Sequence, residues 1–179
     1  MPPRLCGYPV FGLCGYKNSG KTTLVCRLVE EFTRRGLAVA TVKFAHCDIE
    51  VDIDGTDSYR HRAAGARHVA VASPHRWAVF HEIDQPPARP DLPDILPHLG
   101  KADLVLVESN KDGDFPKLEV RDVANPAHAE RPLLADADER ILAIAASGPL
   151  THPRLPVFHR DEVERIADFI ATHLELEAS

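Results

Sequence analysis

Short apolar runs separated by polar turns predict an α/β fold with a mostly parallel sheet flanked by helices. Residues 10–14 form an apolar run that stops at a glycine, which is typical of a buried strand. Residues 21–35 carry apolar side chains at helical spacing, and Gly36 follows as a candidate cap. Residues 38–44 read as a second strand. This strand–loop–helix–strand order is a βαβ unit, whose strands lie parallel in one sheet.

The same alternation continues to the end of the chain. Further strands are predicted over the apolar runs 68–72, 77–83, 103–108 and 141–146. Helices are predicted over 57–64, with Asp57 as the N-cap, and over 161–174. Residues 45–56 are polar and acidic, and the proline-rich stretch 85–97 is expected to be an irregular connector with one or two helical turns. Because no break in composition divides the chain, we predict a single domain over residues 1–179.

Composition narrows the class of protein. Hydrophobic residues make up 44% of the chain and charged residues 27%, as in ordinary globular proteins. The formal net charge of -6 argues against nucleic acid as a partner, because nucleic-acid binders usually carry a basic face. The four cysteines form no CxxC pair, and no apolar run approaches the length of a membrane span. We therefore expect a reduced, cytoplasmic setting and no membrane association.

Residues 15–22 (GYKNSGKT) match the phosphate-binding pattern G-x-x-x-x-G-K-[ST]. Glycines let backbone N–H groups curl around phosphate oxygens, and the helix that follows adds a partial positive charge. Lys21 is expected to reach the β- and γ-phosphates and to act in catalysis, and the Thr22 hydroxyl is placed to bind Mg²⁺. The predicted P-loop contacts are Gly15, Tyr16, Lys17, Asn18, Ser19, Gly20, Lys21, Thr22 and Thr23. For Lys17, a solvated loop charge is an equal alternative to a phosphate or partner contact.

A magnesium site also needs a carboxylate at the end of a neighbouring strand. Glu108 ends the apolar run 103–108, so it is the predicted second catalytic residue and metal ligand beside Thr22. Asp48 follows the second predicted strand and is a further candidate metal ligand. Its rivals are Asp52, Asp54 and Asp57, and the alternative is a solvated acidic loop.

Three other strings carry residue types that occur in functional sites. His46 and Cys47 could suggest a soft-metal site, but such sites need several ligands in closed geometry. Residues 110–112 (NKD) resemble the guanine-reading NKxD motif, yet the required aspartate position is Gly113, so they receive no base-reading role. Residues 145–147 follow a strong strand and are either a base-contacting loop or an ordinary strand end.

Several longer strings, taken in order, resemble the MobB family of molybdopterin guanine dinucleotide biosynthesis proteins. They are GYKNSGKTTL (15–24), ATVKFAHCDIEVDIDGTDSYRHRAAGA (40–66), VASPHRWAV (71–79), DLVLVES (103–109) and FPKLEV (115–120). The resemblance implies a P-loop NTPase fold of a dimeric class, with GTP and Mg²⁺ as ligands and weak hydrolysis. It also implies two partners, the enzyme that joins a GMP unit to molybdopterin, and molybdopterin itself or a molybdoenzyme.

The resemblance extends to single positions. Arg62 and Arg76 match family positions and are candidate contacts for a phosphate-bearing molecule or a partner, with a surface ion pair as the alternative. Pro116, Lys117 and Glu119 match a later motif. The chain departs from the family pattern at Phe44 and Ser109, where a His and a Gly are usual. Hydrolysis and pterin handling are therefore less firmly expected than nucleotide binding.

Rival functions of other classes remain open on the same scaffold. One is a P-loop small-molecule kinase, although the segment 85–97 holds only one arginine, Arg89, for a lid over the phosphates. A second is a metallochaperone-type GTPase with a metal shared across a dimer, with Cys47 as a candidate ligand. A third is a nucleotide-gated interaction protein with no chemistry of its own. The choice of GTP rather than ATP as the ligand rests on the family resemblance alone.

Overall fold

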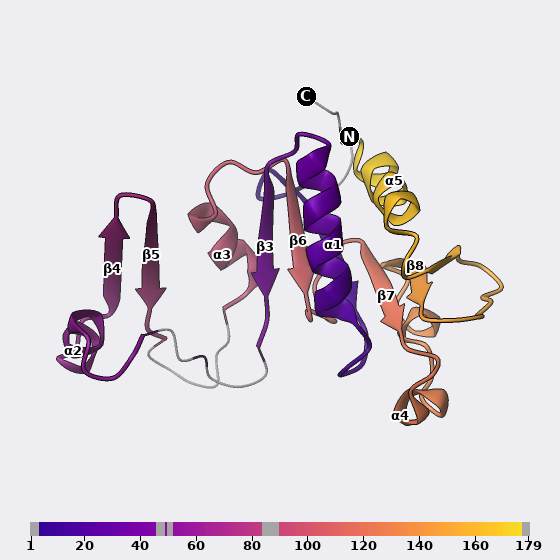
Figure 1. Cartoon of the computed structure of the whole chain (residues 1–179), viewed down its shortest axis with the longest axis horizontal. Helices are drawn as coiled ribbons and strands as arrows, with labels where there is room; N and C mark the ends of the chain where they lie inside the picture. Colours follow the sequence, from indigo (N-terminus) through magenta and orange to yellow (C-terminus); the bar gives the residue numbers. More distant parts are fainter. Residues whose placement is uncertain (1–3, 46–48, 50–51, 84–89, 177–179) are drawn as a thin grey trace. The chain divides into compact units, whose positions relative to one another are not determined.

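The computed structural model describes residues 4–45, 49, 52–83 and 90–176. Within it the chain divides into two compact units, one comprising Met1–Phe44 with Leu92–Ser179 and the other Ala45–Asp91. The first unit holds the main sheet, and the second holds one helix and a hairpin (Figure 1). The prediction of a single domain over the whole chain stays a prediction.

The main sheet of the first unit runs in the order β3-β6-β2-β7-β8-β9, and all neighbours in this order are parallel. A short antiparallel strand, β1, pairs with the start of β2. The strands are β1 (Arg4–Leu5), β2 (Tyr8–Cys14), β3 (Val39–Lys43), β6 (Leu104–Glu108), β7 (Lys117–Arg121), β8 (Ile141–Ala146) and β9 (Val157–His159). The predicted mostly parallel sheet is thus confirmed.

Helices cover both faces of this sheet. The two long helices, α1 (Lys21–Arg34) and α5 (Val163–Leu174), share one core cluster with Leu104 and Leu106 of β6. The short α3 (Leu92–Ile95) and the 3-10 turn η1 (Leu96–His98) pack in a second cluster with Val105 and Val107. Because side chains alternate along a strand, β6 supplies both cores and is buried along its whole length.

The connection from β7 to β8 contains two short helical pieces. These are α4 (Pro126–Ala129) and the 3-10 turn η2 (Leu134–Asp136). Within the described residues, no helix has the length and apolar character that a bilayer crossing requires.

The second unit consists of α2 (Asp57–Ala63) and an antiparallel hairpin of β4 (His68–Ser73) and β5 (Arg76–His81). The helix cap differs from the prediction, because Thr56 is the N-cap and its hydroxyl accepts from Tyr59 N, while Asp57 is the first helical residue. Most of the hairpin is exposed, and Trp77 keeps 68% of its surface accessible.

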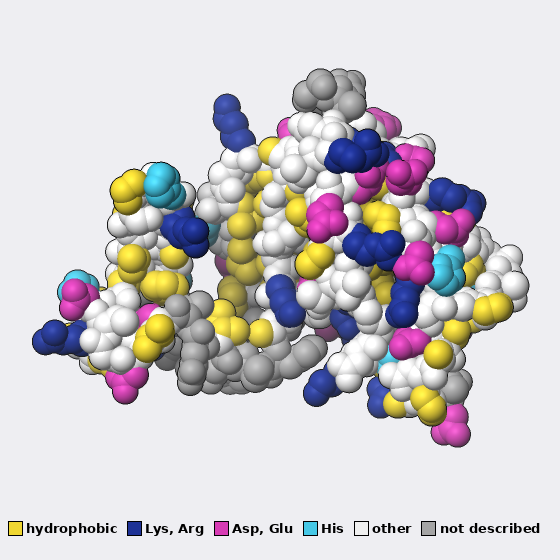
Figure 2. Space-filling model, in the orientation of Figure 1, with side chains coloured by type: hydrophobic (Ala, Val, Ile, Leu, Met, Phe, Trp, Pro, Cys, Tyr) yellow, Lys and Arg dark blue, Asp and Glu magenta, His cyan; other side chains and the backbone are white. Residues whose placement is uncertain are grey.

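Ion pairs on the outer surface join α1 to the C-terminal part of the chain. Arg35 lies between Glu31 and Asp168, at 2.7 Å from each, and Arg27 contacts Asp161 at 2.6 Å. Figure 2 shows basic and acidic side chains interspersed over α1 and α5. Hydrogen bonds from Arg34 and Arg35 lower the pKa of Glu31 to about 2.

The core of α1 gives a direct test of the packing. Leu28 is fully buried in the cluster that α1 shares with the sheet and α5. We expect Leu28→Ala to lower the free energy of unfolding by about 2–5 kcal/mol, because it removes buried methyl groups and leaves a cavity. Urea unfolding measures this change. Ile53→Ala is the control, since 78% of Ile53 is exposed and its truncation should change stability by under about 0.5 kcal/mol. Equal effects of the two substitutions would contradict the assigned core.

Candidate nucleotide-binding site

The predicted site residues of the first unit meet at one edge of the main sheet. Parallel strands bring their carboxyl ends together, and ligands of open α/β sheets bind outside those ends. Gly15 follows β2, Glu108 ends β6, and Lys43 ends the neighbouring β3. Lys43 and Glu108 are register partners, so the carboxylate and the lysine lie side by side.

The loop 15–20 has the backbone that its glycines permit. Gly15 has a φ of 147°, and a Cβ there would lie 2.4 Å from Val120 O and 2.8 Å from Ser19 Oγ. Gly20 has a φ of 93° and is the N-cap of α1. Side chains would strain or block both positions. The free N–H groups at the start of α1 therefore face the loop, as an anion site requires.

Two polar side chains of the loop fit a phosphate ligand. Lys21 Nζ donates to Gly15 O at 3.2 Å and to Tyr16 O at 2.7 Å, so the ammonium is folded back over its own loop. Burial lowers the pKa of Lys21, and the charges of Lys111 and Lys43 lower it further against the opposing effect of Glu108. Ser19 Oγ is buried without a hydrogen-bond partner. Both groups are suited to phosphate oxygens.

The predicted metal ligands of this unit lie in contact. Thr22 Oγ1 donates to Glu108 Oε1 at 2.6 Å, although the two residues are far apart in sequence. Glu108 is 6% exposed, whereas Thr22 is exposed, so the pair lies at the mouth of the loop. Lys43 Nζ lies 3.7 Å from the same carboxylate oxygen. A hydroxyl and a carboxylate beside a phosphate loop form the oxygen donor set that Mg²⁺ takes.

The remaining P-loop residues are held from outside the loop. Tyr16 donates from its hydroxyl to Pro132 O at 3.0 Å. His128 donates from Nε2 to Lys17 O at 2.9 Å. The side chains of Lys17, Asn18 and Thr23 are exposed. The segment after β7 thus fixes the first half of the phosphate loop.

The other predicted site residues lie in the second unit or outside the described residues. Arg62 and Arg76 lie in the second unit. Arg62 is already paired, with Asp52 at 2.7 Å and Glu82 at 3.5 Å, which supports the ion-pair alternative. Arg76 sits at the hairpin turn and is exposed. Asp48 lies outside the described residues, as do His46 and Cys47.

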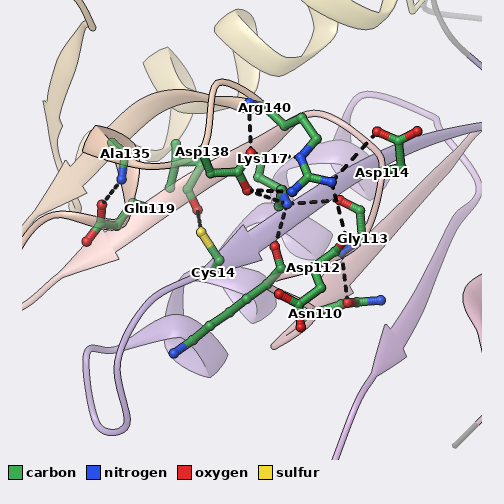
Figure 3. A network of polar contacts seen from close by, with 12 residues as sticks. Cys14, Asn110, Asp112, Gly113, Asp114, Lys117, Glu119, Ala135, Asp138 and Arg140 are labelled. Carbon is green, nitrogen blue, oxygen red and sulfur yellow. Dashed lines mark hydrogen bonds and ion pairs between the residues drawn. The ribbon is translucent and has the colours of Figure 1, made fainter.

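Sequence reasoning missed β7 and the charges buried on it. Lys117 and Glu119 are fully buried, and Arg121 is 6% exposed. Lys117 Nζ lies 2.8 Å from Asp138 Oδ2, and Glu119 accepts from Ala135 N at 2.9 Å (Figure 3). Burial raises the pKa of Glu119. In the sequence, charged and apolar residues alternate here, which is typical of a strand with one face in solvent. The charged residues at 138 and 140 were the only sequence signal that the charges on β7 could be paired and buried.

A further cation at this edge was also missed. Arg160 follows β9, and a Cβ placed on Gly20 would lie 3.2 Å from its Nη1. The hydrogen bond from Ser147 is the main cause that lowers the pKa of Asp122, and the charge of Arg160 lowers it further. Ser147 ends the segment 145–147, for which a base-contacting loop and an ordinary strand end were both open, and its hydroxyl is already bonded to Asp122.

The sheet order, the glycine loop that opens α1 and the Thr22–Glu108 pair define a P-loop NTPase fold. The model of the family described as molybdopterin guanine dinucleotide synthesis protein B matches residues 10–147. The chain therefore belongs to the MobB family.

Relatives and solved structures agree with this assignment. A protein of Haemophilus influenzae named molybdopterin-guanine dinucleotide biosynthesis adapter protein is 34% identical, over 93% of this chain and 89% of its own. A protein of the same name from Escherichia coli is 32% identical, over 93% and 94%. A crystal structure titled molybdopterin-guanine biosynthesis protein B (mobB) is 29% identical, with a TM-score of 0.69 over 93% of this chain and 99% of that one.

The ion pair between the buried Lys117 of β7 and Asp138 predicts a pH dependence of stability. Burial opposes ionisation of Asp138, but hydrogen bonds from Arg140 and Lys117 hold its pKa at about 2, below the ordinary 3.8. Its contribution to stability is therefore present above about pH 4 and is lost as the pH falls towards 2. We expect Asp138→Asn to cost roughly 3 kcal/mol at neutral pH, because Lys117 stays buried without its counter-charge.

Urea unfolding at several pH values between 2 and 7 tests this assignment. The Asp138→Asn protein should lose less stability between pH 4 and pH 2 than the wild type. Asp114→Asn is the matched control, because Asp114 is 97% exposed and lies 3.7 Å from the same Arg140. An acid dependence that Asp138→Asn leaves unchanged would show that this carboxylate is not the group responsible.

Proposed function

We propose that this chain is a GTP-binding adapter protein of molybdopterin guanine dinucleotide synthesis. The observation that carries the nucleotide part is the contact of Thr22 with Glu108 at the mouth of the phosphate loop. Membership of the MobB family and the names of the relatives support the pathway. GTP, rather than ATP, is proposed on the same ground.

In this proposal, some residues bind the phosphates and others bind the metal ion. The loop amides and Lys21 bind the phosphates, and Lys21 exchanges its two loop carbonyls for phosphate oxygens. Thr22 and Glu108 hold Mg²⁺, which neutralises phosphate charge when bound. Asp48 is proposed as an additional metal ligand. Arg76 is the better placed of the two predicted arginines for a second phosphate-bearing molecule or partner, because Arg62 would first have to leave Asp52.

We further propose partners and a setting. The partners are the GMP-transferring enzyme, molybdopterin or a molybdoenzyme, and a second copy of this chain, in the cytoplasm. Exposed apolar side chains in the second unit, among them Trp77 and Val71, support protein contacts there. GTP hydrolysis is expected to be slow at most, because an arginine finger, which alone supplies about 10³–10⁵ in rate, is not assigned.

Two rival functions predict different experimental results. A small-molecule kinase on the same fold would prefer ATP and transfer its phosphate to an acceptor. A metallochaperone-type GTPase would purify with a stoichiometric soft metal. Among the described residues, no three His, Cys, Asp or Glu side chains gather as a metal site, and Cys47 lies outside them.

Lys21→Ala tests the phosphate site. We expect triphosphate affinity to fall on the order of 100-fold or more, because the substitution removes charged hydrogen bonds to the phosphates. Isothermal titration calorimetry with GTP and Mg²⁺ measures the change. Lys101→Ala is the control, since Lys101 is exposed and precedes β6 at the opposite end of the strand from Glu108. Wild-type affinity in the Lys21→Ala protein would reject the assigned site.

The adapter role predicts an effect on the partner enzyme. Adding this protein with GTP to the GMP-transferring enzyme and molybdopterin should raise the yield of the dinucleotide cofactor. The Lys21→Ala protein should raise it less, because it cannot hold the nucleotide. Equal yield with and without the wild-type protein would argue for an interaction protein with no part in this step.

A further inference from the structure

The loop 109–114 starts directly after the candidate metal ligand Glu108. Its first residue, Ser109, has a φ of 68°, so the chain turns sharply at the mouth of the phosphate loop. The string Asn110-Lys111-Asp112 follows, and sequence analysis gave it no base-reading role. In the structure, a buried lysine, Lys117, holds the backbone of this loop and thereby positions the side chain of Lys111.

The support comes from the buried ammonium of Lys117. Its Nζ donates to Lys111 O at 2.6 Å and to Gly113 O at 2.9 Å, and it lies 2.8 Å from Asp138 Oδ2. A lysine ammonium has three donors, so each donor has a partner. Burying an ammonium costs several kcal/mol unless it is paired and hydrogen-bonded in this way. Two of its three contacts go to the loop backbone (Figure 3).

Other contacts hold the residues between. Arg140 donates from Nη1 to Asp112 O at 3.2 Å, and Gly113 N donates to Asn110 Oδ1 at 3.1 Å. A Cβ on Gly113 would lie 2.2 Å from the Phe115 ring, so the loop packs closely on that side chain. Each residue from 110 to 113 therefore makes at least one polar contact, and Lys117 and Arg140 hold the loop backbone at residues 111, 112 and 113.

This backbone directs Lys111 towards the phosphate loop. Lys111 Nζ lies 5.0 Å from the centre of the Tyr16 ring, and its positive charge acts on Lys21. Within the described part of the chain, Lys111 makes no ion pair with a carboxylate. Two lysines held near each other repel, and a polyanion bound between them offsets this repulsion because it attracts both.

We propose that Lys111 is a further cation of the phosphate site, interacting with the terminal phosphate of a bound nucleoside triphosphate, and that Lys117 is the positioning residue that holds its loop. This assignment rests on the proposed nucleotide binding. Because the terminal phosphate distinguishes a triphosphate from a diphosphate, Lys111 would let the protein discriminate between the two states.

The ratio of triphosphate to diphosphate affinity tests Lys111. We expect Lys111→Met to weaken GTP binding about tenfold while changing GDP binding less than about threefold, as the loss of one charged contact predicts. Titration calorimetry with Mg²⁺ and each nucleotide gives both values. Lys111→Arg should restore part of the discrimination, and Lys101→Met is the control for loss of a surface charge.

A double-mutant cycle tests the positioning role of Lys117. Lys117→Met should reduce the GTP-to-GDP ratio in the wild-type background and have no further effect when Lys111 is already Met. A merely structural role would lower affinity equally in both backgrounds. Where Lys117→Met fails to fold, Arg140→Met takes its place, because Arg140 anchors Asp112 O from a partly exposed position.

The outcomes separate this assignment from the proposed function. An unchanged ratio in Lys111→Met, or an equal loss of GTP and GDP affinity, would overturn the role of Lys111 while leaving nucleotide binding intact. Additive effects in the cycle would overturn the role of Lys117. A wild-type protein that binds neither nucleotide would overturn the proposed function itself, and this assignment with it.

Discussion

The buried ammonium of Lys117 is the interaction on which the functional edge of the sheet depends. It joins β7 to the loop that follows Glu108 and to Asp138 ahead of β8. A charge in a fully buried position is tolerated only when all its donors are satisfied, and here they are. The phosphate loop follows β2, which lies between β6 and β7. The loop after β6 and strand β7, which flank β2, are therefore fixed to each other by the buried ammonium of Lys117.

The phosphate loop is held on its other side by residues far away in sequence. Tyr16 and Lys17 are bonded to the segment after β7, through Pro132 and His128. At this edge Lys43 lies 3.7 Å from the buried carboxylate of Glu108, and the charges of Glu108, Lys43 and Lys111 all act on Lys21. Positive charge beside an oxygen donor pair suits a magnesium nucleotide, which is the ligand that we propose.

Local patterns predicted most of the fold, and they singled out residues that the structure brings together at the candidate site. The P-loop, Glu108 and the sequence of strands and helices follow from residues that lie close together in the chain. Strand β7 was missed because it is a short run broken by charged residues at 117, 119 and 121, and the burial of these charges depends on partners elsewhere in the chain, such as Asp138. The Tyr16 and His128 contacts join residues more than a hundred positions apart, which no local pattern reveals. Arg62 was a candidate for a phosphate or partner contact or for a surface ion pair, and only the structure shows its ion pairs with Asp52 and Glu82.

The most direct test of the account is the thermal stability of the wild-type protein with Mg²⁺ and either GTP or ATP at equal concentration. A ligand at a hundredfold its dissociation constant stabilises the folded state by about 2.7 kcal/mol, which raises the melting temperature by several degrees. The account predicts a clear rise with GTP and a smaller one, or none, with ATP. A rise with ATP alone would contradict the GTP assignment and favour the kinase, and no rise with either nucleotide would contradict the phosphate site itself.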